Sequence, residues 1–209
     1  MKPLFFFLLE LEKLKGKMRR GWLLHKIKNG ETTAEHIFHL AFLTWVLGRE
    51  KKLNMEKMLK IALLHDVVEI YAPDLTSYDA CGIKKGITIK NWKKIKPKEG
   101  RPTNEQRKIL ARIKRKLEEK AMNKITKKLP ADLKREFKLL WFDYKNGLSK
   151  ESRFVKQADR FINFFQGMIY SKKCKKIKKK LWLQRIKEVI DDQYLLNLLN
   201  TSESYFFKK

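Results

Sequence analysis

Two ionisable residues interrupt an apolar stretch, "IALLHDVVEI", at residues 61–70. His65 and Asp66 are neighbours there, and Glu69 follows four and three residues later, so on a helix Glu69 shares their face. Burying such groups unpaired costs on the order of several kcal/mol each. An imidazole and two carboxylates on one face therefore indicate part of a divalent-metal site. The alternative is a polar pair that is satisfied within a helix core.

The remaining ligands of such a site have to come from other helices. The preceding helix carries His36 and His39, three residues apart, and Asp159 lies among apolar residues in "FVKQADRFINFF". A mixed set of imidazoles and carboxylates suits Mn, Fe, Co or Zn better than calcium, and spacing alone does not choose among them. His39 has no matching partner and is interpreted as structural. Asp159 has an alternative role as the ion-pair partner of Arg153 or Arg160.

The chain is strongly basic. Lysine and arginine number 50, aspartate and glutamate 23, and the net charge is +27. Such a surface attracts nucleic acid or a phosphorylated substrate, or it is simply a lysine-rich solvated face. Two distant cysteines, Cys81 and Cys174, favour a reduced, cytoplasmic protein. The apolar run at residues 3–9 is too short to span a bilayer, so no membrane association is expected.

The sequence predicts an all-α fold of about seven or more helices, because no useful segment alternates with the period of a strand. Asn54 and one of Thr32 or Thr33 are the expected N-caps. The predicted helices span residues 3–18, 33–50, 55–70, 103–128, 131–146, 150–171 and 177–199. Residues 72–104 form a long basic loop with an ordered piece near 87–95. Loops of this length are often lids or binding segments.

Three segments, in this order, carry a resemblance to a known family: "RRGWLLHKIKNGETTAEH", "ALLHDVVEIYAPDLTSYD" and "KLEEKAMNKITKKLPADLKREFKLLWFDYKNGLSKESRFVKQADR". Together they resemble the HD-domain metal-dependent phosphohydrolases, and within them the 5′-deoxynucleotidase branch. The resemblance runs from about residue 10 to residue 170. It implies an HD-domain helical bundle, a single domain over 1–209, with 171–209 as a C-terminal helical extension.

The resemblance also implies roles for individual residues. One divalent metal ion (Mn, Co, Fe, Mg or Zn) would be held by His36, His65, Asp66 and Asp159. Glu69 would be the catalytic carboxylate, beside Asp66 at the catalytic centre. The substrate-binding residues would be Trp22, Asp74 and a phosphate-binding arginine at Arg19 or Arg20. Departures in "DRFINFFQGMIY", where isoleucines replace acidic residues, leave substrate preference and oligomer contacts open.

The chemistry of phosphomonoester hydrolysis explains why these residue types are needed. The uncatalysed reaction is among the slowest known. A divalent ion activates the attacking water, and a carboxylate orients that water or takes its proton. Cations then hold the phosphate, and the local supply is Arg19, Arg20, Lys26 and Lys28. The leading hypothesis is a metal-dependent phosphomonoesterase that hydrolyses nucleoside 5′-monophosphates, deoxy forms preferred, to nucleoside and phosphate.

Other interpretations remain open. Glu69 could only bond a neighbour, Asp74 could be a turn residue and Trp22 could belong to the core. The same metal site could act on a nucleoside polyphosphate or a cyclic dinucleotide, and a non-catalytic basic nucleic-acid-binding protein is a further alternative. The lysine runs 84–98 and 171–182 carry no recognisable nucleic-acid motif, so only weak, charge-driven binding is expected. The resemblance implies a homodimer.

Overall fold

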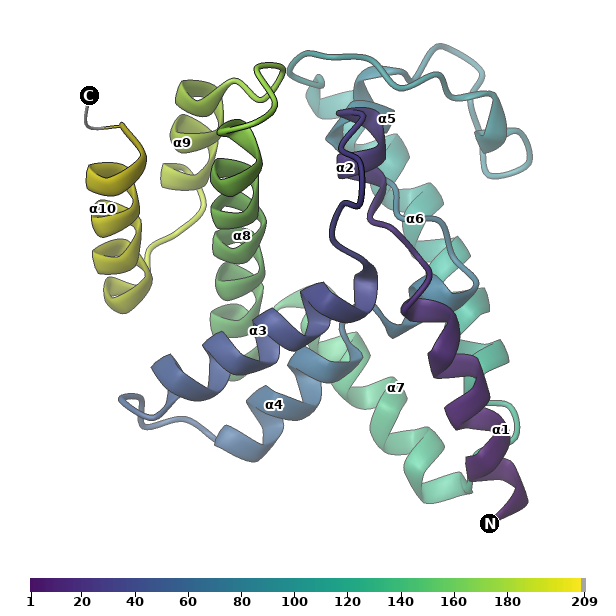
Figure 1. Cartoon of the computed structure of the whole chain (residues 1–209). Helices are drawn as coiled ribbons and strands as arrows, with labels where there is room; N and C mark the ends of the chain where they lie inside the picture. The colour runs from purple at the N-terminus through teal and green to yellow at the C-terminus, as the bar shows by residue number, and fades with distance from the viewer. Residues whose placement is uncertain (208–209) are drawn as a thin grey trace. The chain divides into compact units, whose positions relative to one another are not determined.

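The computed structural model describes residues 1–207, which form helices joined by turns (Figure 1). Within these residues there is no sheet, only an isolated antiparallel bridge between Met18 and Thr32. The helices are α1 (Lys2–Leu11), η1 (Glu12–Leu14), α2 (Arg20–Leu24), α3 (Thr33–Gly48), α4 (Met55–Leu64), η2 (Val67–Ile70), α5 (Ser77–Cys81), η3 (Trp92–Lys94), α6 (Asn104–Ile125), α7 (Ala131–Asn146), α8 (Lys150–Ser171), α9 (Lys179–Lys187) and α10 (Gln193–Phe207), where η marks a 3-10 helix. The all-α prediction is confirmed.

The chain forms two compact units, neither of which is continuous in sequence. The first unit comprises residues 1–33 and 66–135, and the second comprises 34–65 and 136–207. The prediction of a single domain over 1–209 stays a prediction. Among residues 1–207, every helix is either too short or too polar to span a bilayer.

In the first unit, the long helix α6 packs against α5 and η2, and α1 packs against η2. The segment 72–104 is anchored to this unit by buried apolar residues: Leu75, Ala80, Ile83, Ile95, Leu110 and Ile113. A β-carbon on Gly82 would lie 2.0 Å from the carbonyl oxygen of Lys96, so the chain passes itself closely there and only glycine fits. The basic loop therefore has a core of its own and is folded onto α6.

In the second unit, α8 is the central helix and contacts α4, α9 and α10 (Figure 1). Its buried face repeats at helical spacing, with Phe154, Val155, Ala158 and Phe161 all inside. Further along α8, a β-carbon on Gly167 would lie 2.6 Å from the ring of Trp182 on α9. The missing side chain therefore lets α9 pack tightly against α8.

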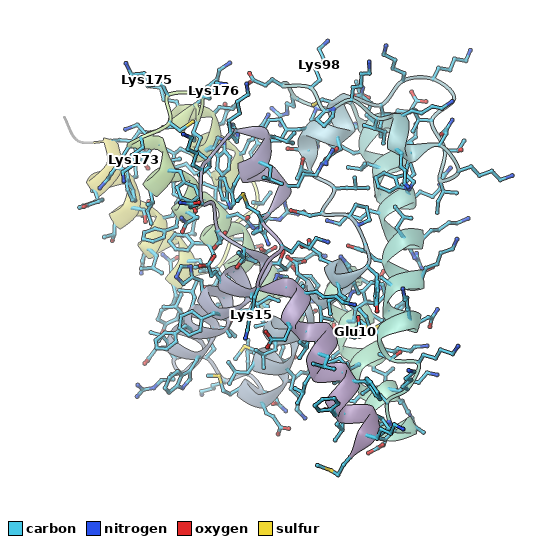
Figure 2. The ribbon with its side chains drawn as sticks, turned by 45° about the vertical axis from the view of Figure 1, so that its right-hand side comes forward. Glu10, Lys15, Lys98, Lys173, Lys175 and Lys176 are labelled. Atoms are coloured by element: carbon cyan, nitrogen blue, oxygen red, sulfur yellow. The ribbon has the colours of Figure 1, made fainter. Side chains whose placement is uncertain are left out.

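The connection between α8 and α9 carries the densest lysine run of the chain. Lys173, Lys175 and Lys176 are exposed and point away from the ribbon (Figure 2). Ile177, in contrast, is buried. The lysines of this connection form a solvated face, and one isoleucine anchors it.

Several helix boundaries differ from the sequence prediction. The helix expected over 3–18 ends as α1 at Leu11 and is followed by η1, and the predicted loop 72–104 contains α5 and η3. The helix expected to run to residue 70 ends at Leu64, and a separate 3-10 helix, η2, follows after His65 and Asp66. The predicted cap Asn54 is confirmed, since its side chain accepts a hydrogen bond from the backbone of Lys57. The break places the two ionisable neighbours in a turn instead of within a continuous helix.

The helix expected over 177–199 is two helices, α9 and α10. Asp192 is the reason for the second start: its Oδ1 accepts from the backbone N–H groups of Tyr194 and Leu195, at 3.1 and 3.3 Å. The side-chain oxygen of Gln157 also accepts from the backbone of Asp191 and Asp192. An aspartate is a favoured N-cap, so "DDQ" marks a helix start that the periodicity had hidden.

Candidate metal centre and active site

Three potential metal ligands converge in the second unit. They are His36 near the start of α3, His65 directly after α4, and Asp159 on α8. One ligand atom from each lies within 4.8 Å of the others. The two histidines are 0% and 1% exposed. Residues 123 positions apart in sequence are therefore brought together inside the unit.

Hydrogen bonds orient both imidazoles. Nδ1 of His65 lies 2.8 Å from the carbonyl oxygen of Ala62, which can only accept, so Nδ1 carries the hydrogen and Nε2 carries the lone pair. Nε2 of His36 lies 3.0 Å from Oδ1 of Asp159. The rings of His36 and His65 meet edge to face, with centroids 5.3 Å apart. A carbonyl partner on the far nitrogen is the usual support for a metal-binding histidine.

Two further side chains hold the carboxylate of Asp159. The hydroxyl of Tyr144 donates to Oδ2 at 3.1 Å, and the amide of Asn163 donates to Oδ1 at 2.8 Å. Neither was identified from the sequence. Asn163 follows Asp159 by four residues on the same helix, which is a usable sequence pattern. Tyr144 lies on α7 and has no such pattern.

The donor set fits a divalent metal ion. Two imidazoles and one carboxylate, in a buried site and with their partners already in place, are ligands that first-row metals accept. His39, three residues after His36, is exposed on the outer face of α3 beside Phe38. This exposed position agrees with the interpretation of His39 as a residue that does not bind the metal.

Glu69, in η2 of the first unit, has an unusual environment for a carboxylate. It is 3% exposed, and its Oε2 accepts a hydrogen bond from the hydroxyl of Thr33 at 2.9 Å. Burial, together with the charges of Asp66 and Asp74, raises the pKa of Glu69 to about 8, against the opposing charges of Arg19 and Lys114. A carboxyl group with a pKa near neutrality is suited to exchange protons.

The two candidate phosphate-binding arginines have different partners. Nη1 of Arg19 donates to Oδ2 of Asp66 at 2.9 Å. The guanidinium of Arg20 forms a bidentate contact with the buried Asp79, with its shortest bond 2.7 Å long. The backbone N–H of Arg20 donates to Asp74 at 2.9 Å. Arg19 therefore lies beside the predicted catalytic aspartate, whereas Arg20 ties α2 to α5.

A family model for the HD domain matches residues 11–196. The chain belongs to the HD-domain family.

Two relatives of this HD domain are named 5′-deoxynucleotidases. The 5′-deoxynucleotidase hdd1 of Schizosaccharomyces pombe is 31% identical over 167 residues, which cover 78% of this chain and 70% of that protein. The 5′-deoxynucleotidase HDDC2 of Mus musculus is 29% identical over 164 residues, 78% of this chain and 68% of that protein. The resemblance identified from the sequence is confirmed.

Solved structures share the fold of this HD domain. A conserved hypothetical protein from Pyrococcus furiosus superposes with a TM-score of 0.67 at 24% identity, covering 95% of this chain and 98% of that one. A protein from Magnetospirillum magnetotacticum, described as a predicted metal-dependent phosphohydrolase, gives 0.66 at 21% identity, with coverage of 99% and 92%.

Two aromatic residues of the HD domain are more enclosed than the sequence indicated. Trp22 is 2% exposed, and its indole N–H donates to Oε2 of Glu31 at 3.1 Å. Its role in lining a nucleotide pocket stays a prediction. His25, interpreted as a loop residue, is buried, and its Nε2 lies 2.7 Å from the hydroxyl of Tyr78.

Proposed function

We propose that this HD domain is a metal-dependent hydrolase that converts nucleoside 5′-monophosphates, deoxy forms preferred, to nucleoside and phosphate. The observation that carries the proposal is the convergence of His36, His65 and Asp159 within 4.8 Å. Membership of the HD-domain family supports it, as do relatives named 5′-deoxynucleotidase over more than three quarters of the chain.

The ligands of the metal in this proposal are His36, His65, Asp66 and Asp159. Asp66 is included because it follows His65 directly in the sequence and is only half-buried. When bound, a divalent ion supplies positive charge to the phosphoryl oxygens and lowers the pKa of a water molecule. Tyr144 and Asn163 keep Asp159 in its orientation, and the carbonyl of Ala62 fixes the tautomer of His65.

The protein's own groups provide proton transfer and substrate binding. The ionised form of Glu69 takes the proton of the attacking water, and its raised pKa makes that form a stronger base than an ordinary carboxylate. Arg19 lies beside Asp66 and binds the phosphate, with Arg20 as the second candidate. Asp74 and Trp22 are the remaining substrate-binding residues in this proposal, with Trp22 lining the nucleotide pocket. These roles follow from the match of the residues to the family motif.

We extend the proposal to the setting in which the enzyme works. It acts as a homodimer in the cytoplasm, on small-molecule nucleotides, without a specific nucleic-acid partner. Light scattering of the purified protein at several concentrations tests the dimer. Binding to nucleic acid is expected to be weak and to vanish at moderate salt, because it rests on charge alone.

The test of the activity is phosphate release from a panel of deoxy- and ribonucleoside 5′-monophosphates. The protein is stripped of metal and then given Mn, Co, Mg or Zn, and Asp66→Ala and Glu69→Gln are measured in parallel. Release that metal restores and that both variants abolish supports the proposal. If wild type binds metal and Asp66→Ala does not, but no monophosphate is cleaved, the nucleotidase assignment is wrong. Polyphosphorylated and cyclic nucleotides are then the substrates to test.

A further inference from the structure

A short antiparallel contact between residues 17–19 and 31–33 lies next to Glu69 in the first unit. Besides the bridge between Met18 and Thr32, the backbone N–H of Arg19 donates to the carbonyl of Glu31 at 3.0 Å. The backbone N–H of Thr33 donates to the carbonyl of Lys17 at 2.8 Å. Residues 17–19 and 31–33 are thereby held side by side, and each of these two segments directs one side chain at Glu69.

The first of these side chains is that of Thr33. It is 0% exposed, and its Oγ1 lies 2.9 Å from Oε2 of Glu69 and 3.3 Å from the carbonyl oxygen of Lys17. A hydroxyl has one hydrogen to donate. The shorter distance and the greater acceptor strength of a carboxylate favour Glu69 as the acceptor.

The second is Lys17. Its ammonium donates to the carbonyl oxygen of Glu69 itself and, at 2.8 Å, to that of Ala72. These carbonyls lie at and just beyond the end of η2, where a short helix leaves acceptors without intrahelical partners. Lys17 therefore holds the backbone of Glu69 and Thr33 holds its carboxylate, and the backbone bridge keeps these two residues side by side.

We propose that Thr33 and Lys17 are positioning residues that hold the Glu69 carboxylate in its reactive orientation. The inference rests on the proposed function, in which Glu69 takes the proton of the attacking water. Glu69 needs such restraint because η2 is only four residues long and because the carboxylates of Asp66 and Asp74 repel it. A displacement of about 1 Å in a catalytic group can cost roughly 100-fold in rate.

The closing experiment compares substitutions that remove one hydrogen-bond donor each. Thr33→Val keeps the shape and removes the hydroxyl, and Thr33→Ser restores it. Thr126→Val is the matched control, because Thr126 is equally buried but bonds the backbone of Met122 in its own helix. Lys17→Met is paired with Lys15→Met, since Lys15 is exposed and bonds only the exposed Glu12 in its own turn.

Thr33→Val and Lys17→Met are expected to lower kcat about 10- to 100-fold and to change KM less than about twofold. Thr33→Ser recovers most of kcat, and both controls stay near wild type. In a Glu69→Gln background, Thr33→Val has no further effect, because a positioning residue acts through the group it holds. An equal loss in both backgrounds, or no rescue by serine, overturns the inference.

A second measurement separates this inference from the proposed function. If wild-type protein cleaves no nucleotide, the proposed function has failed, and urea unfolding then tests the contact. The four-variant cycle of Thr33→Val and Glu69→Gln is expected to show a coupling of about fivefold or more in the unfolding equilibrium constant. A coupling below about twofold overturns the contact, whichever substrate the enzyme uses.

Discussion

Tyr144 and Asp159 are joined by a hydrogen bond of 3.1 Å between the phenolic hydroxyl and Oδ2. The other carboxylate oxygen, Oδ1, lies within 3.0 Å of both His36 Nε2 and Asn163 Nδ2. Each carboxylate oxygen of Asp159 therefore has its own hydrogen-bond partners, which fix the orientation of the side chain. The ring of Tyr144 also lies edge to face with that of His65, at 5.5 Å between centroids. One tyrosine therefore contacts two members of the metal-binding group.

This arrangement predicts that Tyr144→Phe weakens metal binding without abolishing it. The ring and its contact with His65 stay, but Asp159 loses one donor, and such outer partners are typically worth about 10- to 100-fold in affinity. Calorimetric titration of metal-stripped protein with Mn or Co measures the change. Tyr194→Phe, on the solvent side of α10, is the control and should titrate like wild type. Equal affinities for both variants would contradict the assignment of Tyr144.

His36→Gln and His39→Gln form a matched pair on α3. The first removes a buried imidazole from the ligand group, and the second removes an exposed one three residues away. We expect His36→Gln to lose metal binding by about 100-fold or more, whereas His39→Gln retains it. Metal content by elemental analysis and the shift of Tm on adding metal measure the difference. Equal binding by both variants would place the metal elsewhere.

Glu69 predicts a pH dependence of stability in the chelator-treated protein. Its pKa rises from an ordinary 4.5 to about 8 on folding, so the folded protein keeps a proton that the unfolded chain releases. The contribution of Glu69 to stability is constant below about pH 4.5 and falls as the pH rises toward 8, by about a few kcal/mol. Urea unfolding at several pH values measures this slope. Glu69→Gln should lack it, and an unchanged slope in that variant would assign it to other groups.

Asp143 is a structural carboxylate, and we expect its removal to destabilise the fold. It accepts from the backbone and hydroxyl of Ser149, at 2.9 and 2.7 Å, and pairs with Lys57 at 2.7 Å. Burial raises its pKa, but these bonds outweigh burial and hold the pKa well below its ordinary value. Asp143→Ala is expected to lower the free energy of unfolding by about 1–3 kcal/mol.

The lowered pKa of Asp143 also determines how its contribution to stability changes with pH. Because the pKa of Asp143 is depressed on folding, its contribution is present above its ordinary value of 3.8 and is lost as the pH falls further. The gap in stability between wild type and Asp143→Ala should therefore narrow in acid. Asp132→Ala, exposed at the start of α7, is the control and should cost less than about 1 kcal/mol. A gap that widens below pH 4 would refute the assigned role.

Local sequence patterns predicted the helices well because caps and periodicity are local. Asn54 and Ser149 begin α4 and α8 through their own side chains, which sequence alone can indicate. The end of α4 at Leu64 was missed, since the apolar pattern continues through η2. The partner of η2 at the carbonyl of Glu69 is Lys17, which is distant in sequence.

The sequence predicted those site residues that belong to a recognisable motif. It did not predict residues that reach the site only through tertiary packing. The histidines and Asp159 carry a recognisable order along the chain, and the structure brings them together. Thr33 and Tyr144 carry no such pattern, because the hydroxyl of Thr33 reaches a residue 36 positions away and that of Tyr144 reaches the next helix. Long-range partners of this kind are set by packing, which a single sequence does not display.

The division of the chain into two interleaved units has a consequence for how the protein can be altered. The polypeptide passes from one unit to the other after Thr33, after His65 and after Arg135. Neither unit corresponds to an uninterrupted stretch of gene, so no truncation can supply one whole unit alone. The middle crossing is the peptide bond between His65 and Asp66. An insertion at that bond would separate His65, a member of the metal-binding group, from Asp66, a predicted metal ligand.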